Sequence, residues 1–546
     1  MKWIEENPVK VILLAGAAIF LFHLNVLPVT IMEARNFITA REMIVDGNWL
    51  LTTMNDLPRY QKPPLPSWLT AIPGLIFGAD NPAVLRIPTM IMAIFLGYIG
   101  YIFSLKLVEN KRHALINALI LLSSFYIITI TNEAPWDIYT HGFMLAGIYF
   151  LYRFFREESK KWKYSLLAAI LIGLSFMSKG PVSVYAVLLP FLIAYGIVFR
   201  YKGLKQKGGQ LVVLLLLAAI ISIWWFLYVR WADPAAFLAI TKKETGNWSS
   251  YNVRPFYYYW SFFTQSGLWT IPAFASLFYP YLKNRVSHPA IYRFTFLWTV
   301  LSVVLLSIIP EKKTRYLVPV LIPLALNTGF YIEYAIRAFK DKMNAKERFP
   351  VYFHFGLIGL IGIAFPIAGY FLLKDNIEGL WVYFILTSII LFSLGILIFK
   401  QLRQKNIYYA FLLTIGFVAC IKLTAFPLAK AFQKNEAFNN ISSLKASAEK
   451  EEMNVYSFGE IAPEMIWHYG ASIPLIKEDD TVDLPEENSF AVLVTPVEEN
   501  EFKRIFDASF NIELKEVFDI NYGANPEKRG HKKRLVSKLY LVKRSL

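Results

Sequence analysis

The chain has 546 residues, of which 56% are hydrophobic and 16% aromatic, and its mean hydropathy is +0.42. Only 18% of the residues are charged, against roughly 25% in soluble domains. Apolar runs recur that can each cross a hydrocarbon core of about 30 Å, and they lack the period-2 alternation of membrane β-strands. This composition excludes a soluble helical protein and a β-barrel. The net charge of +16 is explained by basic residues that flank membrane spans, and no nucleic-acid partner is expected.

In chain order, the apolar runs predict a polytopic α-helical membrane protein with about thirteen transmembrane helices. The first run is typical of an uncleaved signal anchor. The only cysteine, Cys420, lies in the last run, so an intrachain disulfide is impossible. The spans are expected at residues 9–28, 83–106, 113–131, 138–155, 164–178, 181–199, 210–230, 261–282, 291–309, 316–336, 352–373, 380–399 and 407–428.

The connecting loops sort by charge. With the N-terminus in the cytoplasm, every cytoplasmic loop is strongly basic and almost free of acids, as at residues 200–207. This is the positive-inside pattern of the cytoplasmic (inner) membrane. The opposite loops mix acids, bases and aromatic residues, and the two longest are 29–82 and 231–260. Nearly all residues with candidate chemistry fall on this outer side.

The composition changes near residue 430, where the chain becomes charged and mixed. We therefore expect a transmembrane domain at 1–429 and a soluble α/β domain at 430–546, outside the membrane because the span count is odd. Strands are expected at residues 454–458, 472–476, 490–496, 514–520 and 537–543, and helices at 463–470 and 498–510.

Residues 33–69 hold the densest group of polar side chains at the membrane edge. The apolar spacing after Glu33 and Arg35 predicts an amphipathic helix at the interface that ends at Gly47. Glu33 has two interpretations, a helix-dipole carboxylate or a general base beside an anionic substrate. Tyr60 and Lys62 precede two prolines that stiffen the backbone. Such a lysine suits a lipid phosphate, although a snorkelling lysine is the alternative.

Further candidates follow on the outer side. Asp137 is either a solvated acid at a span end or functional, and Lys179 needs a partner because its connection is so short. In the aromatic-rich loop 231–260, Glu244 and Arg254 are the candidates. A further polar cluster is formed by Lys312, Lys313, Arg315 and Tyr316. It is either a phosphate-binding cradle or simply charge on the outer side. The chain has no Walker loop, GxGxxG, HExxH or CxxC, and its histidines are dispersed.

The motifs Glu33-x-Arg35, AREM, GNW and YQKPPLPSWL resemble those of integral-membrane glycosyltransferases of the protein O-mannosyltransferase-like family (glycosyltransferase family 39). The lipid A aminoarabinose transferases are the members most alike. Further motifs of the family are matched in the same order by SKGPV, RPFYYY and KKTRYLVPVLIPLAL. The resemblance implies a GT-C fold that transfers a hexose or pentose from a polyprenyl-phosphate carrier, with inversion. The acceptor would be an envelope lipid, glycan or protein on the outer side.

Within the resemblance, the catalytic candidates are Glu33, Asp137 and Glu244. The substrate-binding candidates are Arg35, Tyr60, Lys62, Lys179, Arg254, Lys312, Lys313 and Tyr316. Met32, Gln61 and Thr245 stand where the family has acids and a histidine, which argues against a divalent metal. Two alternatives stay open. One is a non-catalytic relative that binds polyprenyl phosphate; the other is a lipid-linked sugar transporter or flippase, against which stands the absence of duplicated halves.

Overall fold

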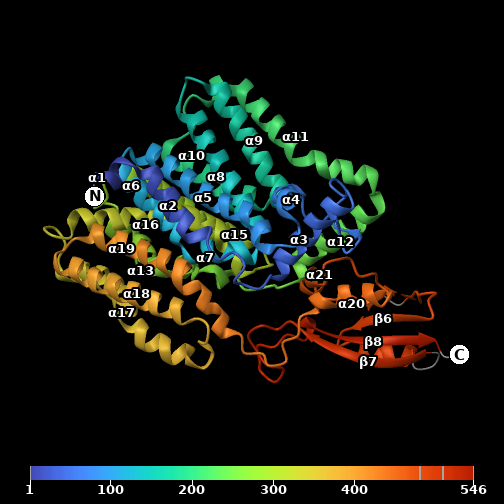
Figure 1. Ribbon diagram of the computed structural model, residues 1–546. Helices are drawn as coiled ribbons and strands as arrows, with labels where there is room; N and C mark the ends of the chain where they lie inside the picture. Colours follow the sequence, from blue (N-terminus) through green and yellow to red (C-terminus); the bar gives the residue numbers. More distant parts are fainter. Residues whose placement is uncertain (1, 479–480, 507–509, 545–546) are drawn as a thin grey trace.

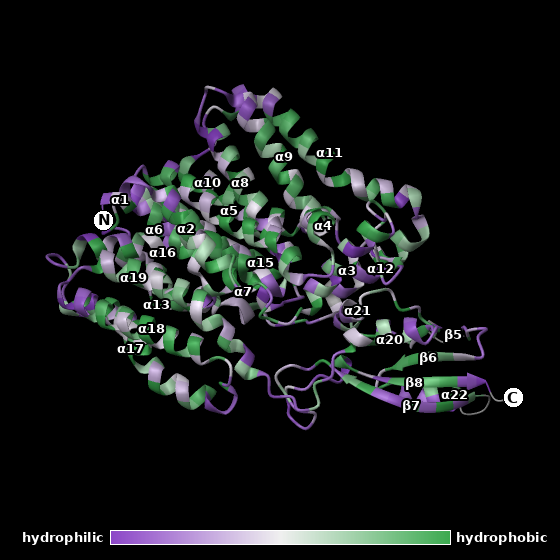
Figure 2. Ribbon diagram, viewed as in Figure 1, coloured by the Kyte–Doolittle hydropathy of each residue, from purple (hydrophilic) through white to green (hydrophobic). Residues whose placement is uncertain are grey.

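A helical membrane part and a small C-terminal part built on a sheet make up the computed structural model, which describes residues 2–478, 481–506 and 510–544 (Figure 1). Apolar residues cover the long helices, whereas polar residues concentrate in the loops and in the C-terminal part (Figure 2). The expected polytopic α-helical protein with a C-terminal α/β part is therefore confirmed. The division between 429 and 430 itself stays a prediction; the last helical segment of the membrane part is η8 (Phe426–Phe432).

Eleven of the thirteen expected spans coincide with helical segments. Of the described helices, seven are long and apolar enough to cross a bilayer, or eight if the α6–α7 pair, bent by 45°, is one span. The number thirteen stays a prediction. The helices are α1 (Lys2–Glu6), α2 (Pro8–Phe20), α5 (Pro82–Val108), α6 (Lys111–Ser123), α7 (Phe125–Glu133), α8 (Pro135–Arg156), α9 (Lys161–Lys179), α10 (Leu189–Phe199), α11 (Gly208–Ala232), α15 (Pro289–Ile308), α16 (Val318–Ala338), α17 (Ala345–Leu373), α18 (Trp381–Arg403) and α19 (Ile407–Cys420).

Two expected spans differ from the structure. The predicted helix 9–28 ends at Phe20, and an irregular segment follows. The predicted helix 261–282 is broken into η4 (Phe262–Trp269), α13 (Thr270–Ser276) and α14 (Tyr279–Leu282). A kink inside η4 lies at Gly267, whose φ is +65° and where a Cβ would lie 2.3 Å from the Cβ of Phe125. The kink lets Trp269 turn into the core, where its indole N–H donates to Ser123 Oγ at 2.8 Å.

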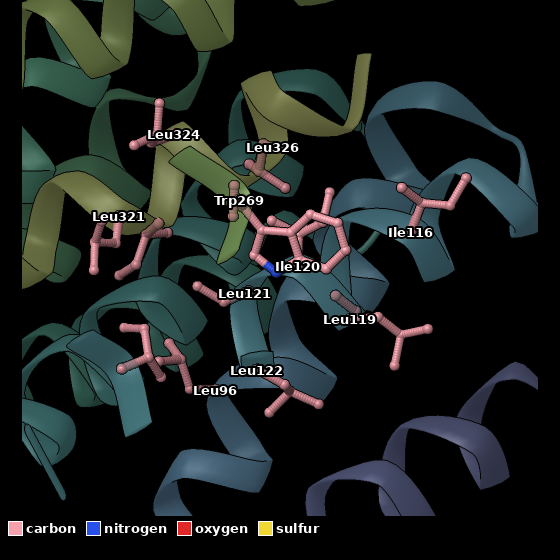
Figure 3. Packing of buried hydrophobic residues seen from close by; sticks show 14 of the residues in the cluster. Leu96, Ile116, Leu119, Ile120, Leu121, Leu122, Trp269, Leu321, Leu324 and Leu326 are labelled. Carbon is pink, nitrogen blue, oxygen red and sulfur yellow. The ribbon is translucent and has the colours of Figure 1, made fainter. Parts of the chain in front are cut away.

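The main core lies between α5, α6, α16 and this kink (Figure 3). Large aliphatic side chains surround the Trp269 ring, among them Leu96, Ile116, Leu119, Ile120, Leu121, Leu122, Leu321, Leu324 and Leu326. A core packed this tightly holds the ends of the helices in fixed positions, and the candidate residues lie at those ends.

The helix expected from residue 33 is α3 (Ile31–Val45), and Gly47, with φ +75°, follows its end. A capping box begins it, because Thr30 and Glu33 satisfy each other's backbone N–H groups. The expectation that α3 is an amphipathic helix with one exposed face is wrong, whereas its position at the membrane interface stays a prediction. Its residues from Asn36 to Met43 are all buried. One face packs on α4 (Leu65–Phe77), and the other packs on the C-terminal part.

The C-terminal sheet has the order β3-β6-β8-β7, with β3 parallel to β6 and the other pairs antiparallel. Four expected strands are confirmed as β3 (Val455–Phe458), β6 (Ser489–Val494), β7 (Phe510–Asp519) and β8 (Val536–Arg544). The fifth, 472–476, forms only one bridge, Leu475 to Ser457, beside Pro474. Short elements complete this part: α20 (Leu444–Lys450), α21 (Pro463–Tyr469), β4 (Lys477–Glu478), β5 (Thr481–Val482) and α22 (Glu499–Phe506). The helix expected over 498–510 ends at Phe506, and residues 507–509 of that prediction lie outside the described residues.

A β-hairpin ties the two parts together. Its strands are β1 (Thr53–Met54) and β2 (Leu57–Pro58), and both turn residues, Asn55 and Asp56, have positive φ. The Asn55 amide N–H₂ donates to the Ile473 carbonyl at 2.8 Å, and the Ile473 N–H donates back to Asn55 Oδ1 at 2.7 Å. The Glu42 carboxylate accepts from the Asn55 N–H at 2.6 Å. The hairpin therefore fixes the loop that carries Lys62.

Candidate functional site

A recess lies between α3, the loop after β2 and the start of α8; the space between its lining residues, its open side included, is about 210 Å³. Its polar lining comes from segments far apart in the sequence, which the core described above brings together. The residues that line it include Thr39, Thr52, Arg59, Lys62, Ser67 and Trp136.

Lys62 faces Glu244 across the edge of this recess. Glu244 lies on α12 (Pro234–Ser250), a helix within the expected outer loop, and its Oε2 is 3.6 Å from Lys62 Nζ. The Glu244 side chain is 40% exposed and the Lys62 side chain 33% exposed, so both remain accessible. The Tyr60 hydroxyl donates to Asp233 Oδ2 at 2.9 Å, which anchors the Lys62 loop to the start of α12. Burial lowers the pKa of Lys62, and the Glu244 carboxylate opposes this effect.

Lys179 and Asp137 form a buried ion pair at 2.5 Å. Asp137 lies in the first turn of α8 and Lys179 ends α9, so each helix dipole favours the charge at its end. The Lys179 ammonium also lies 5.4 Å from the Tyr316 ring centroid. Among the described residues, the buried Asp137 Oδ2 has no hydrogen-bond donor. Asp137 and Lys179 are both electrostatic neighbours of Lys62.

Arg59 is the lining residue that sequence reasoning missed. One guanidinium nitrogen donates to the Arg35 carbonyl at 2.5 Å, and the guanidinium lies 5.4 Å from the Trp136 ring centroid. Burial lowers the pKa of Arg59, and the charge of Arg35 adds to this effect. The sequence offers a signal for Arg59, because it stands three residues before Lys62 on the same proline-bounded loop. Arg35 is half-buried and has Arg315 and Glu464 as electrostatic neighbours.

Glu33 has its carboxylate engaged away from the two lysines. Arg86 Nε lies 2.7 Å from Glu33 Oε1, and a second guanidinium nitrogen lies 2.9 Å from Oε2. Both side chains are 1% exposed. Asn132 and the Thr30 N–H also donate to the carboxylate. A carboxylate with four donors and no solvent contact suits a structural anchor better than a base.

Glu33→Gln is expected to lower the free energy of unfolding by about 3–5 kcal/mol, because the Arg86 charge would stay buried without its counter-ion. The control is Glu449→Gln, which removes an exposed carboxylate. Denaturant titration in micelles measures the difference. Transfer by the folded fraction should stay within several-fold of the unaltered protein. If the variant lost transfer but kept its stability, Glu33 would act as a general base.

Most of the remaining candidates have polar groups that already bind other parts of the protein, whereas one has an exposed side chain. The Lys312 ammonium donates to the backbone carbonyls of Ile309 at 2.6 Å and Arg254 at 3.0 Å, so backbone groups occupy its hydrogen bonds. Burial lowers the pKa of Lys312. Lys313 pairs with Glu311 at 2.7 Å. The Tyr316 hydroxyl donates to the same carboxylate at 3.1 Å. The Arg254 side chain is exposed.

The doubt about a divalent metal, raised by Met32, Gln61 and Thr245, stays a prediction. Among the residues that the structure describes, no three His, Cys, Asp or Glu side chains converge. Thr245, on the helix turn after Glu244, donates its hydroxyl to the carbonyl of Thr241 at 2.9 Å. Glu244 itself is paired with Lys62. No step below is therefore routed through a metal.

The fold and the charged recess at its helix ends define a multi-pass inner-membrane protein of the GT-C architecture. Two structures of ArnT from Cupriavidus metallidurans, one bound to undecaprenyl phosphate and one in the apo state, superpose with a TM-score of 0.68. Each alignment covers 98% of this chain and 97% of ArnT, at 15% identity. At that identity the likeness establishes the fold. The resemblance to lipid A aminoarabinose transferases expected from the motifs is confirmed.

Sequence comparisons agree with this fold. Residues 61–225 match the family described as dolichyl-phosphate-mannose-protein mannosyltransferase. An undecaprenyl phosphate-α-4-amino-4-deoxy-L-arabinose arabinosyl transferase of Proteus mirabilis is 26% identical over 319 residues, which are 57% of this chain and 56% of the relative. An uncharacterized protein of Aquifex aeolicus is 29% identical over 286 residues, 50% of this chain and 54% of the relative. The chain thus spans about half the length of the curated relatives it matches.

Proposed function

We propose that the protein is a glycosyltransferase that moves a sugar from a polyprenyl-phosphate carrier to an acceptor at the outer face of the membrane. The observation that carries the proposal is the convergence of Lys62 and Lys179 with Glu244 and Asp137 beside one recess. Lysines at a membrane edge suit a lipid phosphate, and carboxylates suit sugar hydroxyls and protons. The names of the relatives and the lipid bound to ArnT support this substrate class.

In the proposed reaction, the carrier phosphate binds Lys62 and takes the place of Glu244 in the ion pair. This exchange is easy, because the Lys62–Glu244 pair is long at 3.6 Å and half-exposed, and such pairs contribute only about 0–1 kcal/mol. Lys179, held by Asp137, adds a second positive charge close to Lys62. The two cations stabilise the charge that develops on the leaving phosphate.

Glu244, once released, serves as the general base. An oxygen of the acceptor attacks the anomeric carbon, the bond from that carbon to the carrier phosphate breaks, and the phosphate leaves with the electron pair. The acceptor proton passes to the Glu244 carboxylate. A single displacement of this kind inverts the anomeric centre. Asp137 keeps the Lys179 ammonium charged and in position through their ion pair.

Glu244→Gln tests the function directly. Transfer from a radiolabelled polyprenyl-phosphate sugar to an envelope extract is expected to fall about 10²–10⁴-fold, the range for loss of a general base. Binding of the carrier should remain, since Lys62 stays in place. Lys243→Gln, an exposed neighbour on α12, is the matched control. No labelled product from any donor, with carrier binding intact, would favour the non-catalytic alternative.

The membrane orientation forms part of the proposal. The positive-inside pattern places the N-terminus in the cytoplasm and residues 430–546 outside. The two longest opposite loops carry Lys62 and Glu244, which the structure brings together at 3.6 Å. Loops that meet must share a side of the membrane, and this supports the same placement for both.

A further inference from the structure

A second cavity lies at the end of α2, apart from the Lys62 recess; the space between its lining residues, its open side included, is about 270 Å³. It is bounded by the segment after α2, the start of α5, the end of α7 and the turns that follow α19. Its polar lining includes His23, Asn132 and Lys422, and its apolar wall includes Phe20, Phe22 and Phe426. None of these residues takes part in the proposed transfer.

Two irregular backbone segments shape this cavity. One is the π-helical turn η7 (Ile421–Ala425), which interrupts the regular hydrogen bonding after α19. The other is His23, whose φ of +56° lies in the left-handed region that non-glycine residues avoid. A His23 ring nitrogen lies 2.8 Å from the Leu423 carbonyl of the π-turn, so each irregular segment supports the other. π-turns and strained residues occur preferentially at functional sites.

Lys422 is the charged group that this geometry presents to the cavity. It lies inside the expected span 407–428, where a lysine is costly unless it meets a partner. Its ammonium lies 3.3 Å from the Phe426 ring centroid. Throughout the described parts of the chain, no carboxylate pairs with it and no hydrogen bond to it is found. The neighbouring Arg86 does not need an anion, because Glu33 and backbone carbonyls occupy its guanidinium.

The surroundings indicate what the missing partner is. Leu21, Phe22 and Ile421 are exposed large apolar side chains beside the cavity, so its rim is suited to hydrocarbon and not to water. A cation beside a hydrocarbon-facing rim matches the phosphate and the adjoining chain of a membrane lipid. Asn132, which also donates to Glu33, places the cavity at the same end of the membrane part as α3.

We propose that this cavity binds the phosphate headgroup of a bilayer lipid, with Lys422 as its counter-ion and Phe22 and Phe426 along its chain. The site is distinct from the transfer site, and the proposal does not depend on the proposed function. Two sources share this chemistry, namely an anionic phospholipid and a polyprenyl phosphate, and the experiment below separates them.

Lys422→Met in the full-length protein is the test, made in a Lys62→Met background so that the proposed transfer site does not contribute. Native mass spectrometry measures the affinity for added phosphatidylglycerol, undecaprenyl phosphate and zwitterionic phosphatidylcholine. Lys422→Met should weaken binding of one anionic lipid about tenfold, the loss of one charge-assisted contact, and leave phosphatidylcholine unchanged. Lys430→Met, which removes an exposed lysine of the next turn, should change neither.

Two outcomes would overturn the proposal. One is equal binding of both anionic lipids with and without Lys422. The other is a lower thermal midpoint of Lys422→Met in lipid-free micelles, because that would make the lysine a structural residue. The proposal expects an equal or higher midpoint, since the change removes a partly buried charge without an ionic partner. Which anionic lipid loses affinity identifies the source of the phosphate, and soluble glycerol phosphate should not compete.

Discussion

Lys62→Met is expected to reduce kcat/KM for transfer about a hundredfold or more, because truncating one member of a charged contact costs about 2–5 kcal/mol. The reduction should appear in both carrier affinity and turnover. Lys62 would neutralise the phosphate in the bound carrier and, more strongly, when the leaving phosphate gains charge. Stability should change little, since the Lys62–Glu244 pair is half-exposed.

The pH dependence gives a sharper test of the same lysine. Burial holds the pKa of Lys62 below its ordinary value, so Lys62 loses its proton at a lower pH than a solvent-exposed lysine. Carrier binding requires the protonated form, and it should therefore weaken as the pH rises through this lowered pKa. Lys62→Arg stays charged throughout, so its alkaline limb should move to higher pH even if its maximal rate is lower. An unchanged alkaline limb in Lys62→Arg would show that Lys62 does not contact the phosphate.

Much of this site follows from the sequence because the relevant signals are local. The two prolines after Lys62, the dipole ends occupied by Asp137 and Lys179, and the charge-sorted loops all lie within short stretches. Hydrophobic periodicity likewise places the long helices. These signals predict which residues lie at helix ends on one side, and the structure brings Lys62, Glu244, Asp137 and Lys179 together.

What the sequence does not reveal depends on long-range partners. Glu33 has the spacing of a site residue, but its partner Arg86 is 53 residues away and no pattern links the two. Periodicity shows that α3 has an apolar face, but not that the C-terminal part covers its other face. The kink at Gly267 lies where Phe125 approaches, which is visible only in three dimensions. In each case a tertiary contact overrides the local signal.

Asp137→Asn should be the most destabilising change in the site, and it should also abolish most transfer. It leaves the Lys179 ammonium buried without a counter-ion, at a cost of about 3–5 kcal/mol. Loss of transfer by this variant alone would therefore not separate a catalytic from a structural role. The double variant Asp137→Asn with Lys179→Met removes both charges, so it should recover most of the lost stability.

The double variant is expected to fold but to stay inactive, and this separates the two roles. If the pair acts only as a buried ionic contact, transfer should return together with stability. If Lys179 supplies charge to the phosphate and Asp137 holds it there, transfer should stay at least about a hundredfold low, as for loss of one preorganised donor. The matched control is Lys207→Met. Lys207 is a fully buried lysine outside α8 whose ammonium donates to the Phe154 carbonyl, near the end of α8, at 2.9 Å. It should lower stability without lowering transfer per folded molecule, because its cation lies at the opposite end of the helix from Asp137.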